Sequence, residues 1–207
     1  MPKIPVSAIA LLALLSGIPH AHASSPSYWD LDMTHSSVGF VVRHMTVTNV
    51  RGEFNEASGT LVFDPRDPTR SRIEATIKAA SIDTKLAKRD EHLRNEDFLY
   101  VARYPSITFR STRIVRTGGH YLVTGKLTIR DVTREVTLKT TAPSPVITDP
   151  WGGRRIGFSA SVRIDRKAFN VRWNVALDNG GLVVADEVDI ILELQFVERK
   201  PSATSTN

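Results

Sequence analysis

Apolar and polar residues alternate along most of this chain with a period of two. In 188–196 every second residue is apolar and the intervening positions are mostly charged or polar, and 72–79, 121–130 and 156–164 repeat the pattern. Successive side chains of a β-strand point to opposite faces, so this period indicates strands with one buried face. Turn-forming Asp, Asn, Gly and Pro residues between these segments favour antiparallel hairpins. The sequence therefore predicts an all-β protein.

Long antiparallel strands restrict the architecture further. An open sheet leaves unpaired strand edges, and closure into a barrel removes them. We therefore expect a barrel, with a two-sheet sandwich as the alternative. A chain of 207 residues, of which 41% are hydrophobic, is large enough for one such domain with a substantial core.

One stretch, 84–99, breaks the alternation. Two of its leucines are seven residues apart among charged residues, which predicts a short helix. Asp83 or Thr84 can cap its first turn, and Pro105 excludes helix soon afterwards. We expect this insert to cross or close one end of the barrel, either as a solvated connection or as part of a binding site.

The first 23 residues have the features of a Sec-type signal peptide. Lys3 supplies a positive charge, 6–15 is almost wholly apolar, and Ala21 and Ala23 are the small residues that cleavage requires. The apolar stretch is too short to span about 30 Å of hydrocarbon. The sequence therefore predicts export without a membrane anchor.

Cleavage between Ala23 and Ser24 leaves a mature domain from 24 to 199 and a disordered tail from 200 to 207. We expect a periplasmic location, because a chain without cysteine has no disulfides and depends on its core for stability. The net charge of +5 is modest, and the basic residues are scattered singly along the strands. This distribution argues against a nucleic-acid partner.

Small residues fall on the predicted inward faces among large apolar residues. Ala75, Ala79, Gly125 and Ala160 have the inward parity, so the interior has room for one slender ligand if they leave it unfilled. A packed core without a cavity is the alternative. The side chains expected to line the interior are Phe40, Val42, Ala75, Ile77, Phe109, Val123, Leu127, Phe158, Ala160, Val162, Ile190 and Leu192.

Two sets of polar side chains are candidates for chemistry. Arg89 and His92 lie in the predicted helix, where either could contact a phosphate or quinone head group, although Arg89 could instead pin the helix to the barrel. His35, His44 and His92 are the candidates for a metal site or an enzyme, but the first two are nine residues apart, which places them on opposite faces of a regular strand. Without the common nucleophile, zinc or phosphate-loop motifs, we expect no catalytic residues and no metal site.

Several short motifs follow one another along nearly the whole predicted mature chain: HSSVGF (35–40), VRGEF (50–54), SIDT (81–84), RDEHL (89–93), YPSITFRS (104–111) and GKLTIRDVT (125–133). Their order resembles that of the YceI-like family. Asp131, Asn170 and Leu99 depart from the usual family residues, which are two glycines and an aromatic. Asp and Asn tolerate left-handed turn geometry, so the fold is expected to persist.

The resemblance implies a lipocalin-like, extended antiparallel barrel of about eight strands that holds a polyisoprenoid, a quinone-type lipid or a similar amphiphile. It also implies a periplasmic protein without a catalytic centre or a required cofactor. A stress-related structural scaffold with an incidental cavity and a histidine-based metal protein or enzyme remain the alternatives. Transient membrane contact and a homodimer are further expectations, because an apolar barrel mouth would be an exposed patch unless covered.

Overall fold

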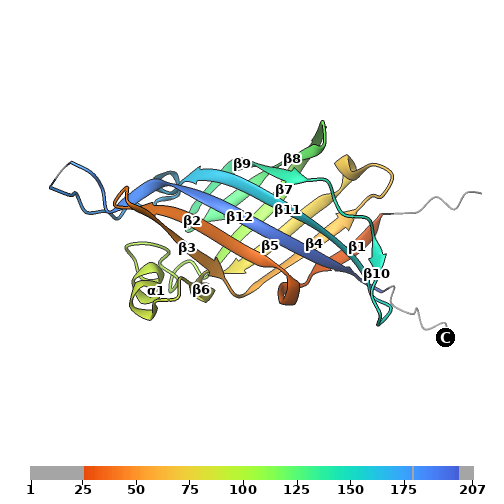
Figure 1. Cartoon of the computed structure of the whole chain (residues 1–207), viewed down its shortest axis with the longest axis horizontal. Helices are drawn as coiled ribbons and strands as arrows, with labels where there is room; N and C mark the ends of the chain where they lie inside the picture. Colours follow the sequence, from red (N-terminus) through yellow and green to blue (C-terminus); the bar gives the residue numbers. More distant parts are fainter. Residues whose placement is uncertain (1–25, 179, 201–207) are drawn as a thin grey trace, which may run out of the picture.

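The computed structural model describes residues 26–178 and 180–200, in which strands predominate (Figure 1). The predicted signal peptide, its cleavage site between Ala23 and Ser24, and all of the predicted tail except Lys200 lie outside the described residues. The strands are β1 (Ser27–Leu31), β2 (Ser37–His44), β3 (Thr48–Phe54), β4 (Ala57–Phe63), β5 (Arg72–Lys78), β6 (Ile82–Asp83), β7 (Ser106–Thr117), β8 (His120–Ile129), β9 (Val132–Thr141), β10 (Ile147–Thr148), β11 (Arg154–Asp165) and β12 (Val184–Glu198). The helices are α1 (Ala87–Arg94) and the short 3-10 helices η1 (Met33–His35), η2 (Pro68–Arg70), η3 (Ala79–Ser81) and η4 (Arg166–Phe169).

All of these strands belong to one antiparallel sheet that closes on itself. β1 and β2 both pair with β12, so they act as one bent strand. β3 pairs with β2 and β4 with β1, so β3 and β4 form the next bent strand. β6 pairs with β3 and β5 with β4, so β5 and β6 form the one after it. The long pairing of β11 with β12, from Arg155↔Val197 to Asp165↔Glu187, closes the barrel. The predicted eight-stranded antiparallel barrel is confirmed, and the sandwich alternative was wrong.

The bend between β1 and β2 is held by the carboxylate of Asp32. Its Oδ2 lies 2.8 Å from His35 Nδ1 and accepts hydrogen bonds from Arg155 Nη1 at 2.7 Å and Gln195 Nε2 at 2.9 Å, while Oδ1 accepts from the Thr34 amide at 3.0 Å. Desolvation raises the pKa of Asp32, but the hydrogen bonds from His35, Gln195, Arg155 and Thr34 outweigh it and lower the pKa to about 2. Asp32 therefore ties the bend to β11 and β12 in its ionised form.

Replacement of Asp32 by asparagine is expected to lower the free energy of unfolding at pH 7 by about 1–3 kcal/mol. Folding lowers the pKa of the Asp32 carboxyl from its unfolded value near 4 to about 2. The stability that this carboxylate contributes is therefore fully present above about pH 4 and is lost as the pH falls through about 2. Urea denaturation at pH 7, 4 and 2.5 measures this loss. Asp30→Asn, which removes an exposed ion pair with Arg199, is the control and should cost less than about 1 kcal/mol. Equal losses in the two variants would contradict the prediction.

One end of the barrel is filled by packed side chains. Trp29 is fully buried and donates from Nε1 to Ser27 Oγ at 2.7 Å, and its ring meets Phe63 edge-on at 6.4 Å between centroids. Leu61, Ile156 and Phe196 complete this buried cluster. Apolar packing therefore closes the barrel interior at the end that carries β10.

The opposite end is covered by α1, the turns of 95–104 and the segments 170–178 and 180–183 (Figure 1). The predicted helix over 84–99 was too long, because α1 spans only Ala87–Arg94 and the backbone becomes extended at Asn95. We refer to this side of the molecule as the α1 end.

The start of α1 differs from the predicted capping. Leu86 occupies the N-cap position, and neither Asp83 nor Thr84 caps the helix. Lys85 has a left-handed backbone with φ 64°, which prevents the helix from starting earlier. Asp90, in the first turn, instead accepts hydrogen bonds from the amide of Thr84, at 2.9 Å, and from its hydroxyl. A carboxylate at this position suits the positive end of the helix dipole.

Candidate functional site

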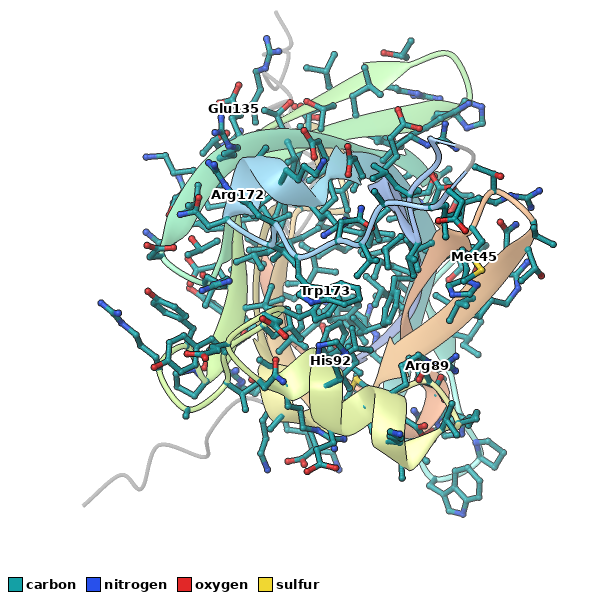
Figure 2. All side chains as sticks on the ribbon, turned by 90° about the vertical axis from the view of Figure 1, so that its left-hand side faces the viewer. Met45, Arg89, His92, Glu135, Arg172 and Trp173 are labelled. Atoms are coloured by element: carbon teal, nitrogen blue, oxygen red, sulfur yellow. The ribbon has the colours of Figure 1, made fainter. Side chains whose placement is uncertain are left out.

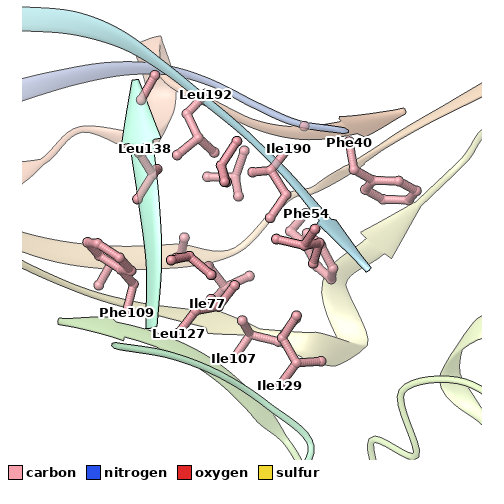
Figure 3. A pocket seen from close by; sticks show the side chains of 18 of the residues that line it. Phe40, Phe54, Ile77, Ile107, Phe109, Leu127, Ile129, Leu138, Ile190 and Leu192 are labelled. Atoms are coloured by element: carbon pink, nitrogen blue, oxygen red, sulfur yellow. The ribbon is translucent and has the colours of Figure 1, made fainter. Parts of the chain in front are cut away.

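The barrel interior contains an apolar cavity of about 240 Å³ (Figure 3). It exceeds the roughly 150 Å³ of an engineered protein cavity that stays dry and binds benzene. Of the residues that line it, only Glu74, Thr140 and Arg166 are polar, and Glu74 lies on the outward parity of β5. Glu74 has its carboxylate 2.7 Å from the exposed guanidinium of Arg110. The cavity is therefore suited to an apolar ligand.

All twelve side chains that the alternation assigned to the interior line this cavity. Figure 3 shows Phe40, Ile190 and Leu192 on one side of the cavity and Ile77 and Phe109 on another. The strand register explains the agreement, since residues of one parity share a face along each strand. Whether a ligand occupies the cavity stays a prediction.

The sequence analysis missed the wall residues at the α1 end. Leu93, Phe98 and Leu99 reach the cavity from α1 and the turns after it, and Phe169 and Val171 reach it from the connection between β11 and β12. These segments do not alternate, so no periodicity marked their inward side chains. Leu99, where the family usually has an aromatic, is nevertheless a wall residue.

Two of the four small inward residues do not leave space. A Cβ on Gly125 would lie 2.5 Å from Phe109 Cζ and 2.6 Å from the Arg110 carbonyl oxygen, so the Phe109 ring already covers that position. Ala79 is 1% exposed and belongs to the packed core. Ala75 and Ala160 line the cavity as expected. The expectation of free space at Gly125 and Ala79 was wrong because neighbouring side chains fill it.

Arg166 is the buried charge of the cavity wall, with 5% of its surface exposed. Its Nε donates to the carbonyl oxygen of Ala185 at 2.9 Å, Nη1 donates to those of Val171 and Trp173 at 2.9 and 2.8 Å, and Nη2 donates to that of Val184 at 3.3 Å. Burial lowers the pKa of Arg166, but a guanidinium stays protonated in proteins. Because most of its donors already bind backbone, Arg166 positions the segment 171–173 across the barrel end.

His92 lies where α1 meets the segment 171–173 (Figure 2). Its ring contacts Phe98 and Trp173 edge-on, with centroids 5.0 and 4.9 Å away, and its Nε2 is 2.9 Å from Asp97 Oδ2. The helix α1 and the segment 171–173 therefore meet at an aromatic contact between His92, Phe98 and Trp173. His92 is absent from the cavity wall.

Arg89, the other candidate for a head group, is held by Thr84. Nε donates to Thr84 Oγ1 and Nη2 to the Thr84 carbonyl oxygen, both at 2.7 Å. It also lies outside the cavity wall. These contacts favour the pinning role for Arg89, and contact of either residue with a ligand stays a prediction.

The three histidines considered for metal binding lie at separate places. His35 is in η1, His44 ends β2 and His92 is on α1. In 26–178 and 180–200, no group of three or more histidine, aspartate or glutamate side chains is placed to hold a metal ion. None of the helices in the same residues is long and apolar enough to cross a lipid bilayer.

A family model described as the YceI-like domain matches residues 29–196. This chain belongs to the YceI-like family. Protein YceI of Escherichia coli O157:H7 is 36% identical to it over 171 residues, which cover 83% of this chain and 86% of the relative. The resemblance seen in the short motifs is thereby confirmed.

Solved structures have the same YceI-like fold. BcnA of Burkholderia cenocepacia superposes with a TM-score of 0.66 at 29% identity, covering 80% of this chain and 98% of the other. A domain of Saccharophagus degradans described as polyisoprenoid-binding superposes with a TM-score of 0.60 at 17% identity, covering 84% of this chain and all of the other. The second likeness is one of fold.

The departures from the usual YceI-like residues have different structural outcomes. Asn170 adopts a left-handed backbone with φ 62°, as expected for a residue in place of glycine. At the turn between β8 and β9, the left-handed residue is Arg130, with φ 56°, and not Asp131. Asp131 accepts a hydrogen bond from Asn170 Nδ2 at 3.2 Å, which links this turn to η4.

Proposed function

We propose that this YceI-like barrel is a non-enzymatic carrier that holds one amphiphilic lipid, of polyisoprenoid or quinone type, in its apolar cavity. The supporting observation is an apolar wall, in which the inward polar side chains of Thr140 and Arg166 are already bonded to backbone carbonyls. The polyisoprenoid-binding description of the Saccharophagus degradans domain supports the same ligand class.

Apolar burial is sufficient to retain such a ligand. Each CH₂-sized group that leaves water contributes about 0.8 kcal/mol, so a prenyl tail requires no polar partner. Trp29 and Phe196 fill one barrel end, which favours a ligand whose polar head lies near the α1 end. The described wall offers no histidine, serine or lysine, and we therefore assign the cavity no catalytic step.

We also propose that the protein acts in the periplasm. The positive residue, short apolar stretch and Ala21-His22-Ala23 pattern at the start of the sequence support export with cleavage before Ser24. The mass of the protein from a periplasmic fraction reports this cleavage directly.

The affinity for prenyl alcohols is expected to rise with chain length and to change little with salt concentration. Apolar transfer scales with buried area, whereas exposed charge contacts weaken as ionic strength rises. Native mass spectrometry of mature protein from its own periplasm, followed by solvent extraction and rebinding of alcohols of graded length, measures both dependences.

The expected native mass contains one extractable lipid, and the stripped protein should take up one prenyl alcohol. Protein that carries no lipid and ignores every prenyl length would contradict the proposal and favour the scaffold with an incidental cavity. Binding that depends on an added metal ion would favour the histidine-based alternative.

A further inference from the structure

Exposed apolar side chains gather on loops at the α1 end. Met45 and Val47 occupy the turn between β2 and β3, Leu86 precedes α1, and Val175 lies in the connection to β12, with Val47 75% exposed. The turn and the connection are in contact, because the Met45 amide donates to the carbonyl oxygen of Val183 and the Val183 amide to that of Val175. We call Met45, Val47, Leu86 and Val175 the loop patch. Figure 2 faces this end and labels Met45 on the turn after β2 and Arg89 on α1.

The segments that carry the loop patch are basic. Lys85 lies 3.0 Å from both Glu53 and Asp83, which offset its charge. Among the described residues, no ion pair includes Arg43, Lys88 or Arg172. Segments 43–51, 84–89 and 172–178 together contain the basic residues Arg43, Arg51, Lys85, Lys88, Arg89 and Arg172 and the acidic residue Asp178. The rest of α1 and 95–104 add Arg94 and Arg103 and the acidic residues Asp90, Glu91, Glu96 and Asp97, so basic residues remain in excess at this end.

The opposite end also exposes apolar side chains, and several of its charged residues form ion pairs. Tyr28, Ile147 and Trp151 are exposed there, with Trp151 84% exposed. The buried cluster around Trp29 separates them from the cavity. Ion pairs at that end include Arg154–Glu198 at 2.6 Å, Arg155–Asp32 at 2.7 Å, Arg155–Asp149 at 2.6 Å, Arg199–Asp30 at 2.5 Å and Arg70–Asp64 at 3.7 Å.

We propose that the α1 end docks on a lipid bilayer that carries anionic head groups. The loop patch enters the head-group region, while the cations without carboxylate partners contact the lipid phosphates. Apolar side chains flanked by long basic ones suit this boundary, because the basic stems remain in apolar surroundings and their charges reach the head groups.

The docking site has a direct relation to the cavity. The loop patch and the cover of the cavity share segments. Leu86 precedes α1, which carries the wall residue Leu93, and Val175 lies in the same connection as the wall residue Val171. This part of the inference rests on the proposed lipid-carrier function. Docking at this end brings the cavity to the bilayer, so a lipid tail exchanges without crossing bulk water.

Cosedimentation of the mature protein with vesicles tests the proposal. Phosphatidylcholine vesicles are compared with vesicles that contain phosphatidylcholine and phosphatidylglycerol, at low and high salt. Val47→Asp with Val175→Asp removes the apolar contact, and Lys88→Gln with Arg172→Gln removes two charges. Ile147→Asp with Trp151→Asp is the matched control at the opposite end. Native mass spectrometry of each variant reports its bound lipid.

The wild type is expected to bind the anionic vesicles and to be released by high salt. Each variant pair at the α1 end should weaken binding by at least about tenfold, with the control pair within about twofold of the wild type. These variants should keep their bound lipid, since none of the four residues lines the cavity. Vesicle binding by lipid-free protein would support docking and contradict only the carrier function.

Three results would overturn the docking proposal. The first is wild-type protein that does not sediment with anionic vesicles at low salt, whatever lipid it carries. The second is loss of binding in the Ile147→Asp, Trp151→Asp control with full binding by the Val47→Asp, Val175→Asp variant. The third is a dimer in light scattering that the Val47→Asp, Val175→Asp variant dissociates while its vesicle binding stays at the wild-type level, which would make the loop patch a contact between two copies of this chain.

Discussion

Replacement of Ala75 by phenylalanine is expected to abolish lipid binding while the barrel still folds. Ala75 lies on the inward face of β5, pairs with Gly59 and Phe109 on the neighbouring strands, and lines the cavity. An aromatic ring at this position occupies space that the ligand tail requires. We expect prenyl affinity to fall at least about a hundredfold, which corresponds to about 2.8 kcal/mol of lost binding free energy.

The added ring is expected to lower the free energy of unfolding by about 1–3 kcal/mol, because it overpacks the wall. Urea denaturation therefore accompanies the rebinding assay. Thr76→Phe adds a ring to the exposed face of the same strand and should bind prenyl alcohols like the wild type. A folded Ala75→Phe protein with wild-type affinity would show that the ligand does not use this cavity.

Replacement of Arg166 by methionine is expected to lower the free energy of unfolding by about 3–5 kcal/mol. Methionine retains much of the apolar volume but leaves the carbonyl oxygens of Val171, Trp173 and Ala185 without their charged donor. Buried carbonyl groups without partners are costly, and the segment 171–173 loses its attachment to the start of β12. Urea denaturation measures the change in stability.

Arg163 provides the matched control for Arg166. It lies on β11, is 60% exposed and pairs with Asp189 and Glu187 in solvent. Arg163→Met should therefore cost less than about 1 kcal/mol, because exposed ion pairs contribute little. Similar stability of the Arg166→Met protein and the wild type would contradict the conclusion that Arg166 holds the segment 171–173 against the start of β12.

The cavity wall was predictable where it is built from strands. Once Phe40, Ile77 and Leu192 are assigned to alternating segments, the pleat places each of them on the inward face, and long hydrogen-bonded pairings keep that parity. The wall at the α1 end was not predictable in this way. Phe98 and Val171 lie in turns, where the direction of a side chain depends on local backbone geometry and has no fixed period.

Free volume could not be derived from residue size alone. Gly125 and Ala75 are both small and both inward in parity, but the Phe109 ring covers the first, whereas the second borders the cavity. The difference depends on the rotamer of a residue on a neighbouring strand. Such choices are settled only when all side chains pack together at near-crystalline density.

The sequence by itself determined the all-β class, the family and the inward face of each long strand. The inward face is determined because alternate residues of a strand point to the same side, and only one of the two sides is apolar. The tertiary structure decided the limits of α1, the role of Arg166 and the volume of the cavity. The limits of α1 depend on the backbone conformation at Lys85 and Asn95, and the role of Arg166 depends on contacts with residues far along the chain, such as Ala185. Periodicity reports only what neighbouring residues share, so it carries no information about these contacts.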